Sequence, residues 1–398
     1  MHHLRRALNS QIVAVCVVVF IGDMVAGIIS PTFSLFAEQL GISLVVLGLI
    51  NTIGGLTSLT TAFPIGAISD RVSRARVIRS GMIGFMLATA AIALAENEFP
   101  LILGRILLAM SAVSVFRICA AHLGDVVSRE RRSLAFGAYA TALGSGVTVG
   151  SFLGGYLGDR YSLSMAYWVA SAAALGGLIF ALIFLKPPEQ VRRRGSERNI
   201  RRDFGELITS RPMLQVAIAS ILVSFSYAGT ITTFFPLRAE NLGLTTAQIG
   251  TIFAVRGVVS TVGRIPSGIL ARYVGDRTIL ISTLVVECVV MLGLWRATGS
   301  AWFFALLAFE GFAYGGFMVS SQTFVTNHAR EEIRGSAIGL YATATGLGAT
   351  LAPLSLGILA DAFGLVNVFP VTAGLVALGI LGIFVIRTNP TAAGAAGS

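Results

Sequence analysis

Seven charged side chains lie inside long apolar runs of this sequence, where a charge must serve a purpose. Placing a charge in the hydrocarbon region of a membrane costs about 3 kcal/mol or more, so such a residue usually marks a transport pathway or an ion pair. A carboxylate in this setting can take up and release a proton, and an arginine can hold an anion. The seven are Asp23, Arg105, Arg117, Arg256, Arg264, Glu287 and Glu310.

Asp23 is the first candidate for proton transfer. At about 1.5 Å per residue, it lies near the middle of its apolar run if that run is a helix. Small and polar residues share its helical face, which is unsuited to contact with lipid. Arg105 and Arg117 lie at flanking depths in another run. We expect Asp23 to exchange a proton and an arginine partner during a working cycle.

Glu310 is the second candidate, and it also lies near the middle of its run, with Tyr314 on the same face. Ser224 and Tyr227 form a comparable polar stripe in the run from 213 to 236. Glu287 differs, because we expect it to form a structural ion pair with Arg256 or Arg264. For Arg264, a second expectation is that its side chain extends to the nearby membrane surface.

The composition of the chain predicts an all-α membrane protein. Of its 398 residues, 55% are hydrophobic and 12% are charged, and the mean hydropathy is +0.81. Soluble domains carry about 25% charged residues. Runs of about 20 apolar residues, the length of a helix that crosses a bilayer, recur along the chain. The short alternating strands of a membrane β-barrel are not the pattern here.

We predict twelve transmembrane helices and a cell (inner) membrane location with both termini in the cytoplasm. Arginines gather in the segments assigned to one side, which the positive-inside rule makes cytoplasmic. The net charge of +10 therefore reports orientation, with no nucleic-acid partner implied. The predicted spans are 11–37, 44–69, 77–95, 101–125, 133–157, 163–185, 213–236, 246–271, 278–295, 301–326, 335–360 and 366–386.

The chain contains an internal repeat with an offset of 202 residues. Pro64 matches Pro266 and Asp159 matches Asp361, and the pairing runs without a gap from about residue 38 to residue 159. Two parallel six-helix halves are a known transporter architecture. We therefore predict two pseudo-symmetric halves, residues 1–185 and 212–398, joined by a basic cytoplasmic linker over residues 186–211.

The turn GAISDRVSRAR, residues 66–76, joins two predicted spans. It resembles the loop signature of the major facilitator superfamily, Gly-x-x-x-Asp-Arg-x-Gly-Arg-Arg, with Ser73 in place of the second Gly. The likeness to the family extends over essentially the whole chain. Glycine allows close helix contact, and an aspartate can sit at the positive end of a helix. The resemblance implies a cytoplasmic latch, made in one state and broken in another, of Gly66, Asp70, Arg71, Arg74 and Asp125.

Two further signatures refine the resemblance. A glycine series in the span 133–157 has the spacing of the signature of the proton-coupled antiporter branch, which includes drug exporters, although Ser151 replaces its Pro. Arg105 resembles the family's fourth-helix signature, Arg-x-x-x-Gly, although Ala109 replaces the Gly. The glycines also leave a groove for close packing against a facing helix. The series is Gly137, Gly146, Gly150, Gly154 and Gly155.

The family architecture implies a central cavity lined by the first, fourth, seventh and tenth helices. We therefore expect a proton-coupled exporter of small, partly apolar molecules that works by alternating access, with Asp23 and Glu310 in proton coupling. The alternatives are an uptake symporter for an anionic metabolite held by Arg117 and Arg256, and a non-transporting membrane sensor. The expected cavity residues are Arg117, Ser224, Tyr227, Arg256 and Tyr314.

The sequence offers no pattern for an enzyme, a cofactor or a metal site. The three cysteines, Cys16, Cys119 and Cys288, all lie in apolar runs and have neither disulfide nor metal-site spacing. His122 and His328 stand alone at the ends of predicted helices. We therefore expect a small-molecule substrate, protons and the lipid bilayer as the partners of this chain.

Overall fold

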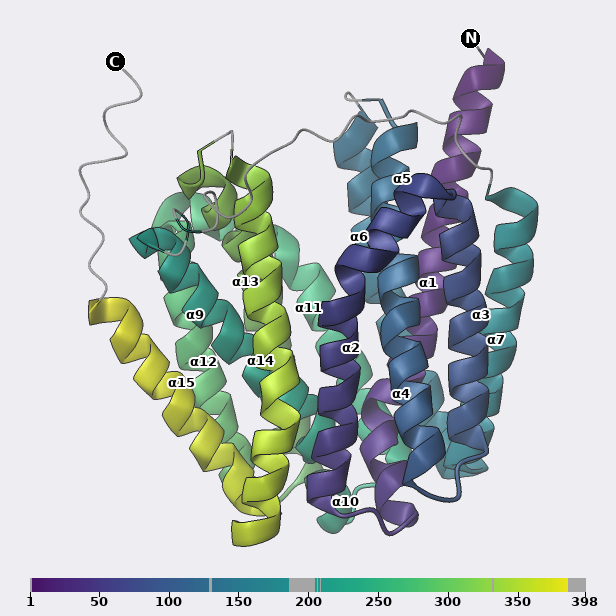
Figure 1. The fold of residues 1–398 in the computed structure, drawn as a ribbon. Helices are drawn as coiled ribbons and strands as arrows, with labels where there is room; N and C mark the ends of the chain where they lie inside the picture. Colours follow the sequence, from purple (N-terminus) through teal and green to yellow (C-terminus); the bar gives the residue numbers. More distant parts are fainter. Residues whose placement is uncertain are drawn as a thin grey trace, which may run out of the picture.

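The computed structural model describes residues 2–128, 131–185, 205, 207, 209–330 and 333–385. In these residues the chain forms twelve long helical stretches and no strand (Figure 1). The stretches are α1 (His2–Gln39), α2 (Leu44–Arg71), α3 (Arg74–Ala93), α4 (Glu98–Ala112) with η1 (Val113–Arg117) and α5 (Ile118–Val126), α6 (Arg132–Arg160), α7 (Leu163–Phe184), α9 (Arg211–Phe225) with η3 (Ser226–Phe234) and α10 (Phe235–Asn241), α11 (Thr246–Val274), α12 (Asp276–Arg296), α13 (Ser300–His328), α14 (Arg334–Phe363), and η5 (Leu365–Asn367) with α15 (Val368–Val385).

The predicted all-α membrane fold of two six-helix halves is confirmed, and each predicted span is a helix whose ends lie within a few residues of the prediction, apart from the earlier start of α1. Two spans contain π-helical segments, η1 and η3, which the sequence reading did not predict. Most of the predicted linker over residues 186–211 lies outside the described residues.

A short turn with a glycine in the left-handed conformation follows the first helical stretch of each half. Gly41 has φ of 72° and Gly243 has φ of 84°, a backbone conformation that glycine adopts without steric cost. After the second turn, Thr245 and Gln248 form a reciprocal capping box at the start of α11. The repeat therefore extends to the backbone of these turns, which tightly connect α1 to α2 and α10 to α11.

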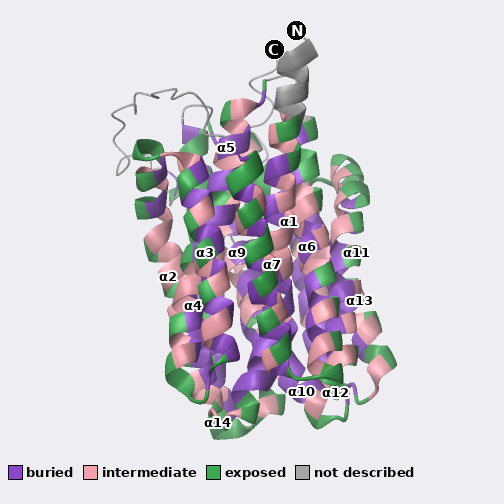
Figure 2. Cartoon of the chain, turned by 90° about the vertical axis from the view of Figure 1, so that its right-hand side faces the viewer, coloured by how far each residue is buried: buried purple, intermediate pink, exposed green. Residues whose placement is uncertain are grey.

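Ten of the helical stretches among the described residues are long and apolar enough to cross a membrane. The remaining two, α6 and α11, contain many small and polar residues, and they pack against each other and against α1 and α13 respectively. Their polarity is tolerated because protein covers much of their surface. Figure 2 shows buried, intermediate and exposed residues interspersed along the helices, as expected for a bundle whose outer faces meet lipid.

The two halves contact each other near one end of the bundle. We call this the far end, because it holds the turns at residues 40–43 and 242–245, opposite the start of α1. There the hydroxyl of Thr52 in α2 donates to the carbonyl of Thr350 in α14 at 2.8 Å. Gly155 of α6 lies against Gly250 of α11, and an added Cβ would be 2.7 Å from its Cα. These contacts close the far end.

At the opposite end, which we call the terminal end, the halves diverge. Figure 1 shows α2 and α14 side by side near α10 and farther apart where α1 begins. An added Cβ on Gly66, Gly137 or Gly339 would meet no heavy atom of a described residue within 4 Å. The bundle is therefore packed at its far end and looser at its terminal end.

Candidate functional site

A cavity of about 410 Å³ lies between the halves and contains both a carboxylate and a guanidinium. Its wall comes mainly from α1, α2 and α4, with Val147 of α6 and two residues of η3. The wall combines apolar and aromatic side chains with hydroxyl and amide groups. The charged members are Asp23 and Arg105, the polar ones are Ser30, Ser34, Asn51, Ser58 and Thr232, and the aromatic ones are Phe33, Phe85 and Tyr227.

Asp23 is held in this wall by the backbone of α6. Its Oδ2 accepts a hydrogen bond from the N–H of Val147 at 3.0 Å. No arginine lies within ion-pair distance of Asp23 among the described residues, so the arginine partner expected from the sequence is absent in this state. Arg264 of α11 interacts with Asp23 only at longer range, through the electric field.

The glycine series on α6 explains how its backbone reaches Asp23. An added Cβ on Gly146 would lie 2.5 Å from the carbonyl oxygen of Phe20 and 2.8 Å from Cβ of Asp23. On Gly154 it would lie 2.5 Å from the carbonyl oxygen of Ile28. Real Cβ atoms do not make such contacts, so only glycine lets α1 and α6 pack this closely.

The other members of the series have different neighbours. Gly150 also packs on α1, against the backbone of Met24 and Ile28. Gly155 faces α11 in the other half, and Gly137, near the terminal end, has no neighbour within 4 Å of an added Cβ. One face of α6 therefore fixes α1, and a second face contacts the opposite half.

Arg105 occupies the cavity wall without an acidic partner among the described residues. Its Nη2 donates to Oδ1 of Asn51 in α2, and its guanidinium carbon lies 4.4 Å from the ring centre of Phe33. Nδ2 of Asn51 donates in turn to Thr233 of η3 at 3.3 Å. Arg105 is thus oriented by a neutral amide and an aromatic ring, and Asn51 connects it to the opposite half.

Behind the cavity wall, Arg256 and Glu310 form a buried ion pair between α11 and α13. Nη2 of Arg256 donates to Oε1 of Glu310 at 2.7 Å, and Nε donates to Oε2. The guanidinium also lies 4.3 Å from the ring centre of Tyr227 and 4.8 Å from that of Tyr314. Because Tyr227 lines the cavity, it separates the ion pair from the open space.

The structure corrects the expected pairing of Glu287. Arg256 pairs with Glu310, and Glu287 accepts a hydrogen bond from the Ser226 hydroxyl at 2.7 Å. Arg264 forms no ion pair within the described residues. The rotation of α11, α12 and α13 about their axes decides which acid meets Arg256, and sequence spacing does not reveal that rotation.

The remaining expected cavity residues lie elsewhere. Tyr314 lies with Arg256 behind Tyr227, and Ser224 is buried in α9 outside the cavity wall. Arg117 is exposed at the end of η1 and also lies outside that wall.

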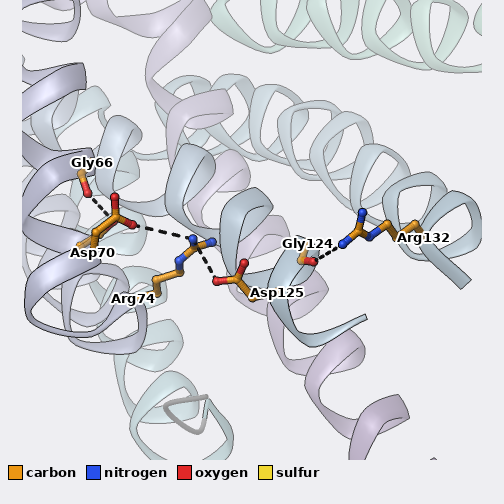
Figure 3. A network of polar contacts seen from close by, with 7 residues as sticks. Gly66, Asp70, Arg74, Gly124, Asp125 and Arg132 are labelled. Carbon is orange, nitrogen blue, oxygen red and sulfur yellow. Dashed lines mark hydrogen bonds and ion pairs between the residues drawn. The ribbon is translucent and has the colours of Figure 1, made fainter. Parts of the chain in front are cut away.

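The latch residues lie at the terminal end, where Arg74 forms the central contact (Figure 3). Its Nη2 lies 2.9 Å from Oδ2 of Asp125 and 3.8 Å from Oδ1 of Asp70. The close helix contact expected at Gly66 is not made, because the halves diverge at this end, and Arg71 is exposed. The ion pairs of Arg74 therefore join residues of the first half, and a latch role for them stays a prediction.

Sequence reasoning missed three features of the site. Asn51 and Phe33 orient Arg105, but a single Asn or Phe in an apolar helix has no distinctive pattern.

The π-helical segment η3 carries the cavity residues Tyr227 and Thr232. Its Thr233 hydroxyl donates to the carbonyl of Ala228, five residues earlier. Such segments often occur at functional sites, and amino-acid composition does not predict them.

Comparisons with known proteins find relatives that match most of this chain. A multidrug resistance protein, MdtG, of Citrobacter koseri is 24% identical over 367 residues, covering 90% of each chain. An uncharacterised MFS-type transporter of Methanocaldococcus jannaschii is 23% identical over 375 residues, covering 92% of this chain and 95% of its own.

Solved structures share the fold. A bacterial homologue of the human lysosomal transporter Spinster, in an inward-facing and occupied conformation, aligns with a TM-score of 0.80 at 14% identity, covering 95% of this chain and 98% of its own. The nucleoside transporter NupG aligns with a TM-score of 0.80 at 13% identity, covering 94% and 98%. The family model of the Major Facilitator Superfamily matches residues 15–239 and 216–398. The chain is therefore a multi-pass membrane transporter that belongs to the Major Facilitator Superfamily.

Proposed function

We propose that this protein is a proton-coupled efflux antiporter for small amphipathic molecules. The position of Asp23 carries the proposal, because an ionisable carboxyl lies in the wall of the cavity between the halves. Its hydrogen bond to the backbone of Val147 holds it there without an arginine within ion-pair distance. A proton that binds Asp23 removes a negative charge from the cavity and changes its affinity for a cationic or amphipathic guest.

The cavity supports the proposed substrate class. Its volume of about 410 Å³ lies within the range of about 300–1,000 Å³ typical of small-molecule sites. Its aromatic residues suit an apolar body, and its carboxylate and hydroxyl groups suit a polar or charged tip. The MdtG relatives, whose name states multidrug resistance, point to the same class.

Alternating access follows from the contacts between the halves. We propose that residues 1–185 and 212–398 rock as two units around the cavity, joined by the linker over residues 186–211. The far-end contacts, such as that between Thr52 and Thr350, break when the cavity opens to that side. By the positive-inside rule, the terminal end of the bundle faces the cytoplasm. Because the halves diverge at that end, this conformation opens toward the cytoplasm.

Flux in inside-out vesicles tests the proposal. Vesicles with an acidic lumen are challenged with a panel of lipophilic cations and small metabolites while the lumen pH is recorded. We expect a lipophilic cation to alkalinise the lumen of vesicles that contain wild-type protein. Asp159→Asn, which changes an exposed aspartate, serves as a matched control and retains the response. If compounds are transported and none of them moves protons across the membrane, the proposal is contradicted.

A second candidate is proton-coupled uptake of an anionic metabolite. Arg105 favours it, because its guanidinium lines the cavity, contacts a neutral amide and an aromatic ring, and has no acidic partner in the part of the chain that the structure describes. Arg256 is less suited to this role, since Glu310 already engages it. In the same vesicles, movement of an anion together with protons, and no response to cations, would replace the efflux proposal with this one.

A further inference from the structure

Two buried carboxyl groups lie near one guanidinium behind the cavity. Glu287 of α12 and Glu310 of α13 are both completely buried, with 0% exposure. They lie on the adjacent helices α12 and α13, close enough for their side chains to interact. Arg256 of α11 forms an ion pair with Glu310, and its charge also acts on Glu287 at longer range. If both acids were ionised, this buried group would carry an uncompensated negative charge.

The hydrogen bonds leave one carboxyl oxygen of the pair without a donor among the described residues. Both oxygens of Glu310 accept from Arg256. Oε2 of Glu287 accepts from the hydroxyl of Ser226, but its Oε1 is buried without a conventional partner among the described residues. An unpaired ionised oxygen in such a place is costly. A proton on one carboxyl satisfies it, because the O–H can donate to the carboxylate of the other.

Among the described residues, the other groups around the pair do not supply the missing charge. From η3 the neighbours are the hydroxyl of Ser226 and the phenol of Tyr227. From α13 the neighbour is the phenol of Tyr314, which lies against Arg256. These groups are neutral at physiological pH. With two carboxyls and one guanidinium, the group is neutral only when it holds one proton.

We propose that Glu287 and Glu310 form a shared proton-binding site that holds one proton in this conformation. The proton bridges the two carboxyls, as in other pairs of acids too close to ionise together. Tyr227 lies between this site and the cavity, so a guest in the cavity would contact the ring that packs on Arg256. Use of this proton in transport rests on the proposed function, but its presence does not.

Infrared spectroscopy of the purified full-length protein tests for the proton directly. Glutamate labelled with carbon-13 in its side-chain carboxyl separates the signal from that of Asp23. At neutral pH we expect a protonated-glutamate band in the wild type, and its loss in both Glu287→Gln and Glu310→Gln. Each substitution leaves one ionised acid facing Arg256. Asp23→Asn and Glu96→Gln serve as controls that retain the band, because Asp23 lies outside the pair and Glu96 is an exposed acid.

Two results overturn the proposal. If neither Glu287→Gln nor Glu310→Gln reduces the band, no proton is bound by the pair. If only Glu287→Gln removes it, the proton belongs to Glu287 alone. Both results leave the vesicle assay unaffected, so they are distinguishable from a failure of the proposed antiport.

A milder pair of variants covers the case in which the glutamine variants do not fold. Ser226→Ala removes the donor to Glu287 and should shift the frequency of the band, because its hydrogen bonding changes. Ser224→Ala alters a buried serine two residues away and should leave the frequency unchanged. Equal spectra for the two serine variants contradict the assignment of the band to this pair.

Discussion

The backbone N–H of Val147 donates to the carboxylate of Asp23 at 3.0 Å, and this contact joins α6 to α1 beside the cavity. It depends on Gly146, where any larger residue would push the two helices apart. The glycine series of α6 therefore has a second consequence besides helix packing. It places a backbone donor against the acid that we propose to carry the coupling proton.

Gly146→Ala tests this dependence. The added methyl group would lie 2.5 Å from the carbonyl oxygen of Phe20, so α1 and α6 must separate. Overpacking of this kind costs about 1–3 kcal/mol, and we expect a lower thermal unfolding temperature in detergent together with impaired transport. Gly137→Ala is the matched control, because its methyl group meets no heavy atom within 4 Å. Equal unfolding temperatures for the two variants would show that Gly146 is not a packing constraint.

The glycine spacing and the helices that carry it can be predicted from the sequence. Continuous apolar runs and the Pro, Gly and Arg residues between them set the helix ends to within a few residues, as for α2, predicted over 44–69 and observed over Leu44–Arg71. The neighbours of each glycine were not readable. Gly146 and Gly155 belong to one series but face different halves, which depends on how α6 packs in three dimensions.

Thr52 is expected to bias the equilibrium between the two open states. Its hydroxyl donates to the carbonyl of Thr350 and accepts from the N–H of Leu354, so it fastens α2 to α14 at the far end. Thr52→Val removes both bonds at similar volume, which should destabilise the far-end contact by about 1 kcal/mol, or roughly fivefold in population. Spin-label distances across the far end measure this shift.

Thr60→Val is the control for that experiment. The hydroxyl of Thr60 donates to Leu56 in its own helix, and Thr60 is exposed. We expect its distance distribution to match that of the wild type. A wild-type distribution for Thr52→Val as well would mean that packing alone closes the far end.

The latch pair of Arg74 and Asp125 should contribute modestly to stability. Their side chains are 15% and 21% exposed and 2.9 Å apart, so water and salt weaken the attraction. We expect Asp125→Asn to lower the free energy of unfolding by about 1 kcal/mol or less, with a smaller effect at high salt. Asp70→Asn should have less effect, since Asp70 is 71% exposed and 3.8 Å from Arg74. A larger loss in Asp70→Asn would contradict this ranking.

Arg105→Lys should weaken substrate binding. Lysine lacks the planar fork that donates to Asn51 and stacks on Phe33, so it would not hold the same position in the cavity wall. We expect Kd to rise by about tenfold, which corresponds to about 1.4 kcal/mol. Arg117→Lys, outside the cavity wall, should bind as the wild type does. Equilibrium binding of a radiolabelled substrate found in the vesicle panel measures both variants, and equal Kd values would remove Arg105 from the site.

The partners of charged residues were the least predictable part of the site. The sequence placed Arg256, Glu287 and Glu310 in membrane helices, and all three are buried there. It did not reveal that Arg256 pairs with Glu310 while Glu287 contacts Ser226, since small rotations of three helices decide between these arrangements. The π-helical turn at η3 contributes as well, because an extra residue in a turn reorients the side chains around it.

Gradient-driven transport by Asp23→Asn tests the central claim most directly. The substrate is one that wild-type protein exchanges for protons in vesicles, and the variant's folding is verified by its unfolding temperature. We predict that Asp23→Asn retains exchange of labelled for unlabelled substrate without a pH gradient but loses accumulation driven by one. Undiminished accumulation in the variant would contradict the role of Asp23 in proton coupling.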